Sequence, residues 1–246
     1  MRESDPGSGA LQPPGWLLIG NSRWHWASGS SDRLRCWSSP PGLDQAGASV
    51  EADHLRAWAA VGPVPTAPWL DPRRRLGLEQ VPLAQLPPWL GVDRALVGWR
   101  AWQLSQAPVL VADAGTALSL TRVDGSGAFA GGRIQAGRLL QLRALASHTA
   151  QLPALQHPAP LAEGAVGEEG LPPWPRQTAA AMEAGVCQGM VAAVAQAWRE
   201  LRRLQPDCRL WITGGDGAWL AEALDQPCQP NLALEALVAL SPEPEG

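Results

Sequence analysis

Residues Val109–Val123 read VLVADAGTALSLTRV: an apolar run, a short turn, and a second run in which apolar and polar residues alternate. Val109–Ala112 is typical of a buried strand, and the alternation of Ala117–Val123 is typical of a strand with one buried face. The turn between them, Asp113–Thr116, combines a carboxylate, a glycine and a hydroxyl. Because glycine lets backbone N–H groups approach an anion closely and threonine adds a donor, this turn is suited to phosphate oxygens.

A similar pattern occurs near the start of the chain. Trp16–Ile19 is apolar, Gly20, Asn21 and Ser22 form a turn, and a second strand is expected over 23–27. Glycine and asparagine tolerate the positive φ that tight turns need, and the serine hydroxyl is a further donor for an anion. The strand–turn–strand pattern therefore occurs twice, which predicts two related halves.

A third turn of small residues follows another apolar strand. The strand is Arg209–Ile212, and the turn, Thr213–Asp216, contains Gly214 and Gly215. Since all three turns come directly after apolar strands, we expect their small residues to emerge at one edge of a sheet. A nucleotide between two such halves would have its phosphates held by both hairpins and its base against the two glycines.

The two halves are expected to cover residues 16–105 and 106–246. Residues 1–15 are polar and rich in Gly and Pro, without the apolar core of a signal peptide, and are expected to form a disordered leader. Hydrophobic spacing and turn residues predict the remaining elements. These are helices over 50–61, 95–103, 137–147, 176–204 and 217–224, and a strand over 128–134.

The helix expected over 176–204 contains the most apolar long window of the chain, Thr178–Trp198. The window carries Glu183 and is followed by arginines, so we interpret it as a buried helix and not as a membrane span. Gly185 and Gly189 lie four residues apart and are expected to permit close packing of another helix.

Composition argues against several classes of function. The net charge of −4 and the pI near 5.6 disfavour nucleic acid or an anionic membrane as the main partner. The four cysteines are widely spaced and lack a nearby histidine, so reduced thiols in a cytoplasmic protein are expected and zinc is not. All 19 basic residues are arginine, which excludes the lysine-dependent P-loop and protein-kinase signatures. Phosphate must then be held by backbone N–H groups, hydroxyls, arginine and metal.

Further motifs occur together with these turns in a fixed order. They are Gly91-Val92-Asp93-Arg94, Asp113–Ala117, Asp124, Gly127, Phe129, Gly131-Gly132, Ile134, Gly137, Ala144-Leu145, Thr149–Pro153, Gln177-Thr178, Ala181–Gly185 and Ile212–Asp216. In this order and spacing they resemble the type III pantothenate kinases, of the acetate and sugar kinase/Hsp70/actin superfamily, over about residues 16–240. The resemblance implies an α/β fold of two RNase H-like (actin-like ATPase) halves, with a nucleotide cleft between them.

The resemblance also implies the reaction: transfer of the γ-phosphoryl group of ATP to pantothenate, the first step of coenzyme A biosynthesis. Gly91, Val92, Asp93, Arg94 and Thr178 match the pantothenate-binding positions, and Asp93 matches the general base. Phosphoryl transfer needs positioning and charge neutralisation above all, and a carboxylate can orient the attacking hydroxyl and accept its proton. Arginine can bind the pantothenate carboxylate with two parallel hydrogen bonds.

The remaining roles concern ATP, cations and the partner subunit. By similarity, Gly20, Asn21, Ser22 and Thr116 face the ATP phosphates, and Asp113 is the ligand of a monovalent cation, K⁺ or NH₄⁺. Mg²⁺ is expected to enter with ATP. The family implies a homodimer in which the pantothenate site is completed near the subunit interface.

Three positions depart from the family pattern. Leu18 stands where the first hairpin usually has an aspartate, Ala136 replaces a proline, and Trp89 stands in place of a tyrosine. Two alternatives therefore stay open. One is a non-catalytic, regulatory relative of the kinase fold, which Leu18 favours and the intact Asp93 and Asp113 oppose. The other is a different small-molecule kinase of the superfamily.

Overall fold

The computed structural model describes residues 15–30, 33–42, 55–155 and 174–241. By their contacts, the residues fall into two units, Met1–Leu76 with Leu237–Gly246 and Gly77–Ala236. The division precedes α1 (Val92–Ser105) and does not fall at the expected 105/106 boundary, because α1 packs against two strands of the second unit. The expected leader lies outside the described residues apart from Gly15.

The sheet of the first unit has the strand order β3-β2-β1-β4. Its strands are β1 (Trp16–Ile19), β2 (Trp24–Ser30), β3 (Arg33–Ser39) and β4 (Ala57–Ala60). The predicted hairpin of β1 and β2 is confirmed, β3 adds a further antiparallel strand, and β4 pairs in parallel with β1. The short 3₁₀ helix η2 (Pro72–Arg74) follows in this unit, and η3 (Leu78–Gln80) begins the second.

The helix expected over 50–61 is wrong where the structure describes it. Ala57–Ala60 is a strand, and its first three residues are buried. A short apolar run that is buried while pairing with a neighbouring strand satisfies a parallel sheet, although its spacing also fits one face of a helix. Residues 50–54 lie outside the described residues.

Tryptophan side chains form much of the first core. The rings of Trp24, Trp26 and Trp69 lie 5.8 to 6.2 Å apart, centre to centre. Trp26 Nε1 donates a hydrogen bond to Ser39 Oγ at 2.9 Å, so the polar atom of this fully buried ring is satisfied. The β1–β2 turn thus connects two strands of a well-packed sheet.

The second unit has a sheet of the order β7-β6-β5-β8. Its strands are β5 (Val109–Ala114), β6 (Ala117–Val123), β7 (Phe129–Ala136) and β8 (Arg209–Thr213). Its helices besides α1 are α2 (Arg138–His148), α3 (Thr178–Leu204) and α4 (Gly217–Ala223). These elements confirm the predicted ones with small shifts at their ends. Helix α5 (Leu232–Leu240) has no counterpart among them.

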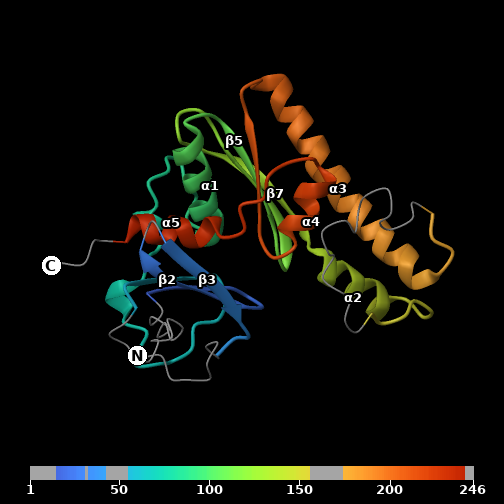
Figure 1. The fold of residues 1–246 in the computed structure, drawn as a ribbon, viewed down its shortest axis with the longest axis horizontal. Helices are drawn as coiled ribbons and strands as arrows, with labels where there is room; N and C mark the ends of the chain where they lie inside the picture. The colour runs from blue at the N-terminus through green and yellow to red at the C-terminus, as the bar shows by residue number, and fades with distance from the viewer. Residues whose placement is uncertain (1–14, 31–32, 43–54, 156–173, 242–246) are drawn as a thin grey trace, which may run out of the picture. The chain divides into compact units, whose positions relative to one another are not determined.

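The two faces of the second sheet are covered by different helices (Figure 1). Leu110 and Leu120 share a hydrophobic cluster with α3 and α4. Thr121 and Val123 point to the other face, where a Cβ on Gly98 of α1 would touch both side chains. Because side chains alternate along a strand, this pattern assigns every residue of β6 to one of the two faces.

Helix α3 is long and apolar enough to cross a membrane, by length and composition only, and 33% of its apolar window is buried. Most of its buried residues, among them Met190 and Val194, belong to the cluster formed with the sheet, as the interpretation as a core helix requires. Gly185 and Gly189 lie outside this contact: no described atom is within 4 Å of a Cβ built on either. The close helix packing expected at these glycines is therefore not made within the described part of the chain.

Candidate active site

Two carboxylates lie near each other where β5 ends and α1 begins. Gly91 is the N-cap of α1 and places Asp93 in the first turn, where its Oδ1 accepts the backbone N–H of Arg94 at 2.7 Å. Burial, and then the negative charge of Asp93, raise the pKa of Asp113 to about 7. Burial also raises the pKa of Asp93. Paired carboxylates with raised pKa values are typical of a site that accepts a proton or a cation.

Arg94 lies on the face of the sheet that α1 covers. Its Nε donates to Thr121 Oγ1 at 3.1 Å and its Nη2 to the Leu120 carbonyl at 3.5 Å. The guanidinium carbon is 5.9 Å from the centre of the Phe129 ring. Gly132 provides the space, since a Cβ there would collide with Arg94 Nη2 and the Leu120 carbonyl. The guanidinium is thereby held in one orientation, as recognition of a carboxylate requires.

The turn after β5 is shaped by the backbone. The Gly115 N–H donates to the Ala117 carbonyl at 3.0 Å, and the Gly137 N–H, at the N-cap of α2, donates to the Thr116 carbonyl at 3.0 Å. A side chain on Gly137 would collide with the carbonyls of Gly115 and Thr116. Only glycine therefore allows α2 to begin so close to this turn.

The turn after β8 lies against the same segment. Gly214 has a φ of +93°, and a Cβ there would collide with the Ala114 carbonyl and the Asp113 carboxylate. The Asp216 N–H donates to the Ala114 carbonyl at 2.8 Å. Nothing described lies within 4 Å of a Cβ built on Gly215, so this side of the turn is open. The structure thus brings the two turns of the second unit together at one end of its sheet.

A buried arginine ties the turn after β8 to two helices. Arg138, the first residue of α2, is 2% exposed and pairs with Glu183 of α3. Its Nε also lies 3.8 Å from Oδ1 of Asp216, the N-cap of α4. Burial raises the pKa of Asp216. Sequence analysis missed this network because its charges come from three separate segments, and no local spacing connects them.

The hairpin of the first unit repeats the arrangement of the second. The Gly20 N–H donates to the Arg23 carbonyl at 3.0 Å, and the Gly62 N–H, beyond β4, to the Ile19 carbonyl at 3.2 Å. A Cβ on Gly62 would collide with the Gly20 carbonyl. Gly62 was not among the predicted site residues, although a glycine shortly after an apolar run is a usable signal.

The remaining predicted residues differ in exposure. Asn21, Ser22 and Thr116 lie at the exposed turns. Thr178 is exposed at the start of α3, which covers the face of the sheet opposite Arg94. The residues of α3 that pack on this face begin one turn later, at Met182.

Two polar residues of β6 were missed as well. Ser119 pairs with Asp113 across the strands, and Thr121 holds Arg94. Both are buried. The sequence pattern that could have identified them is the alternation of β6, which puts these two hydroxyls on one face of the sheet and leucines on the other.

Within the described ranges, no group of three or more His, Cys, Asp or Glu could hold a metal ion. Asp113 offers one partly buried carboxylate beside backbone carbonyls, a set of hard oxygen donors that fits an alkali cation. It does not make a complete cage for Mg²⁺, which usually takes one or two carboxylates together with substrate phosphates.

Two sheets with the same strand order, each with a glycine turn after its first central strand, confirm the expected α/β fold with two related sheets. A Campylobacter jejuni protein described as a Baf family transcriptional activator has the same fold. Its TM-score is 0.57 at 18% sequence identity, over 92% of this chain and 96% of that chain.

The family is more specific. A family model of the type III pantothenate kinases matches residues 66–200. The type III pantothenate kinase of Synechococcus elongatus is 35% identical over 244 residues, covering 92% of this chain and 95% of the relative. The type III pantothenate kinase of Thermosynechococcus vestitus is 38% identical over 213 residues, covering 85% of this chain and 79% of the relative. This chain belongs to the type III pantothenate kinase family, which confirms the resemblance seen in its motifs.

Proposed function

We propose that this protein phosphorylates pantothenate with ATP and that Asp93 is its general base. The observation that carries the proposal is the pair of Asp93 and Asp113 beside a fixed arginine, in a chain that belongs to the type III pantothenate kinase family. The product is 4′-phosphopantothenate, and the reaction is the first step of coenzyme A biosynthesis.

In the chemical step, the oxygen of the primary hydroxyl of pantothenate forms a bond to the γ-phosphorus of ATP. The bond from that phosphorus to the bridging oxygen breaks, and ADP leaves with the electron pair. The hydroxyl proton passes to the Asp93 carboxylate, whose raised pKa makes it a better acceptor than an exposed aspartate. The loose transition state needs little deprotonation in advance, so orientation of the hydroxyl is the larger contribution.

Arg94 binds the carboxylate of pantothenate in this proposal. Its contacts with Thr121 and Leu120 hold the guanidinium before substrate arrives, which lowers the entropy cost of binding. Burial lowers the pKa of Arg94, but arginine remains charged at any physiological pH.

ATP phosphates are bound in this proposal by the turns Gly20–Ser22 and Gly115–Thr116, and the base packs against Gly214 and Gly215. With no lysine in the chain, backbone N–H groups and the two hydroxyls supply the donors. Mg²⁺ bound to ATP neutralises phosphate charge. A monovalent cation, K⁺ or NH₄⁺, is held by Asp113 and favours the ionised form of this carboxylate, which burial disfavours.

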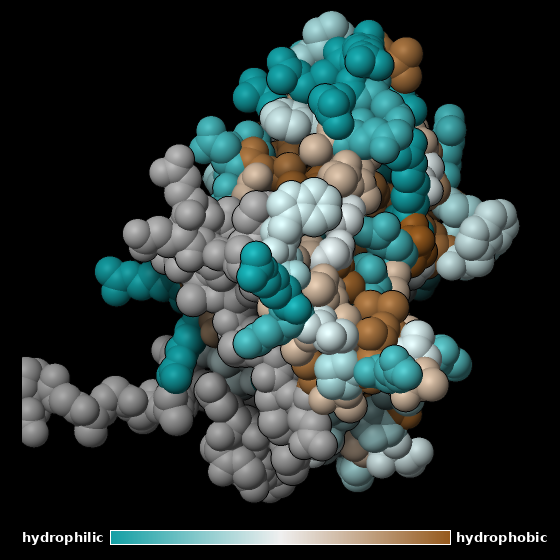
Figure 2. All heavy atoms as spheres, turned by 90° about the vertical axis from the view of Figure 1, so that its right-hand side faces the viewer, coloured by the Kyte–Doolittle hydropathy of each residue, from teal (hydrophilic) through white to brown (hydrophobic). Residues whose placement is uncertain are grey.

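We infer a cytoplasmic homodimer in which Thr178 completes the pantothenate site of the partner subunit. Thr178 is exposed at the start of α3, and α3 packs on the face of the sheet opposite Arg94, which favours a contribution of Thr178 to the site of a second copy. The open glycines of α3 and the exposed Leu139 and Leu140 of α2 supply a surface for that copy. Figure 2 shows hydrophobic residues gathered in the middle of the face that bears α2 and α3, below a hydrophilic upper part.

A coupled assay of ADP formation with purified protein, ATP, Mg²⁺ and K⁺ tests the function. We expect ADP release that depends on pantothenate. If ADP forms only with another acceptor, the chain is a different small-molecule kinase. If none forms under any Mg²⁺ concentration, the buried Leu18 (6% exposed) marks a non-catalytic relative of the fold. Light scattering tests the dimer, and a monomer at micromolar concentration would contradict it.

A further inference from the structure

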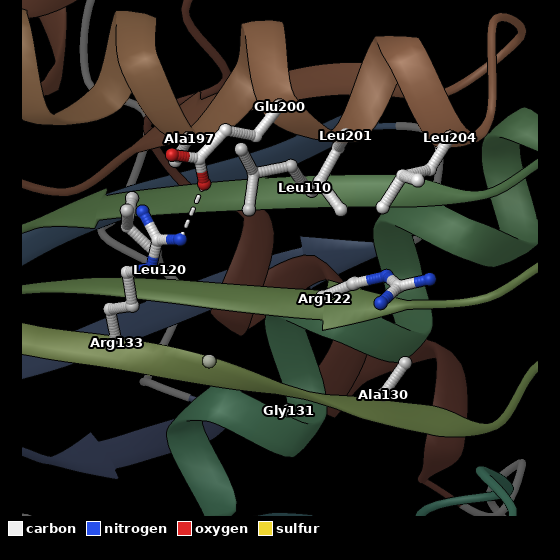
Figure 3. Close-up of a pocket in the computed structure, with 11 residues that line it drawn as sticks. Leu110, Leu120, Arg122, Ala130, Gly131, Arg133, Ala197, Glu200, Leu201 and Leu204 are labelled. Carbon is white, nitrogen blue, oxygen red and sulfur yellow. Dashed lines mark hydrogen bonds and ion pairs between the residues drawn. The ribbon is translucent and has the colours of Figure 1, made fainter.

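A groove of about 270 Å³ lies in the second unit between the sheet and the C-terminal part of α3. Leu110 and Leu120 of the sheet form its floor, and Leu201 and Leu204 of α3 form a wall (Figure 3). The groove is on the α3 face of the sheet, whereas Arg94 lies on the α1 face. It is therefore separate from the proposed pantothenate site.

Two arginines and one glutamate supply the charges of the groove. Arg122 and Arg133 extend from β6 and β7, and Glu200 comes from α3 (Figure 3). Arg133 Nη2 lies 2.6 Å from Glu200 Oε2. The hydrogen bond from Arg133 lowers the pKa of Glu200, which is therefore ionised at neutral pH. These two charges compensate each other, so the lining side chains carry one net positive charge, that of Arg122, which also interacts with the Asp124 carboxylate outside the groove.

The guanidinium of Arg122 is only partly satisfied. Its Nη2 donates to Gln205 Oε1 at 3.2 Å. Its Nε is buried and, among the described residues, has no hydrogen-bond partner. A guanidinium whose donors are incompletely paired is suited to a further acceptor. A carboxylate fits a guanidinium edge best because both groups are planar.

We propose that this groove binds a small aliphatic carboxylate, with the carboxylate on Arg122 and the chain on the leucines. The one net positive charge of the lining side chains matches a monoanion, and the leucine lining matches an aliphatic chain. The volume is just below the roughly 300–1,000 Å³ of common ligand sites, so a chain of about six carbon atoms is suitable.

The test is isothermal titration calorimetry of the full-length protein with hexanoate, in the absence of ATP and pantothenate. We expect saturable binding. Hexanol lacks the charge and acetate lacks the chain, so each should bind at least about tenfold more weakly. Equal binding of acetate and hexanoate would overturn the proposal, as would no binding of hexanoate at tens of millimolar.

Two variants place the ligand in the groove. Arg122→Gln removes the cation and should weaken hexanoate binding at least about tenfold. Ala130→Leu fills the groove from β7 without changing the charge and should weaken it as strongly. Arg203→Gln removes an exposed arginine of α3 that does not line the groove and is the matched control. Circular dichroism checks that each variant folds, and unchanged hexanoate binding in both groove variants would overturn the proposal.

Discussion

The two sheets of this protein have the same strand order but different chemistry at the same strand position. In each, a central strand pairs antiparallel with the next strand and parallel with a later one. Leu18 of β1 and Asp113 of β5 both stand two residues before the glycine of the following turn. One half therefore has a buried leucine where the other has a carboxylate.

The residues that pair with Asp113 and with Leu18 on the neighbouring strands also differ. Asp113 pairs across the strands with Ser119 and Thr213, both polar. Leu18 pairs with His25, whose pKa is lowered by burial, and with Ala59. The second half thus pairs its carboxylate with two hydroxyl side chains, whereas the first half pairs its leucine with a histidine and an alanine. The shared topology reflects backbone pairing, whereas the site chemistry depends on side chains that topology does not prescribe.

The largest expected effect belongs to the second half. Asp93→Asn keeps the shape of the side chain but removes the proton acceptor, so kcat should fall about 10²–10⁴-fold. Binding of ATP, measured by calorimetry, should change little. Activity within a few-fold of the natural protein would remove Asp93 from the proposed mechanism, and the contrast between the halves would lose its main support.

Asp113→Ala tests the cation role of the same half. The variant should lose most activity, roughly 10²-fold, and the remaining rate should no longer depend on K⁺ or NH₄⁺. The measurement is the steady-state rate in K⁺, NH₄⁺ and Na⁺ buffers, for the natural protein and the variant. Equal rates of the natural protein in all three buffers would contradict the assignment.

Leu18→Asp tests whether the first half can be given the missing acid. A charge at this buried position, opposite the neutral His25, should cost about 1–3 kcal/mol of unfolding free energy. If the variant folds, the Mg²⁺ concentration for half-maximal rate should fall, because a second carboxylate is offered to the metal bound by ATP. Leu18→Asn is the matched control: it is polar without charge and should destabilise without lowering the Mg²⁺ requirement.

The smallest expected effect is the pH dependence of stability that Asp113 confers. Its pKa is about 7 when folded and near 3.8 when exposed, so the folded protein binds more protons between these pH values. The contribution of Asp113 to the free energy of unfolding should therefore be highest below about pH 4 and should fall as the pH rises to about 7. Asp113→Asn does not titrate and should be more stable than the natural protein above pH 7.

Thermal unfolding in buffers without K⁺, NH₄⁺ or Mg²⁺ measures this difference across pH. A difference that stays constant from pH 4 to 8 would show that the Asp113 carboxylate is compensated in the folded protein. The two halves would then be less different in their electrostatics than we infer.

Much of the second half could be predicted from sequence, and less of the first. The strands and turn around Asp113 have an alternating pattern and a diagnostic glycine, and they were confirmed with small shifts. In the first half, the apolar spacing over 50–61 predicts a helix, whereas Ala57–Ala60 is a strand, because spacing that fits one face of a helix also occurs in a short buried strand. Gly62 was missed because its importance comes from contact with Gly20, which is far from it in sequence.

By itself, the sequence determined the duplicated strand–turn–strand pattern, the family and the set of candidate residues, since these depend on local composition and motif order. Only the tertiary structure decided that Thr121 and Gly132 hold Arg94, that Arg138 joins two helices to the turn after β8, and that Leu18 lies opposite a half-buried histidine. These facts depend on which distant segments pair and which faces they bury. Strand pairing and burial are set by the free energy of the whole chain, so no local window contains them.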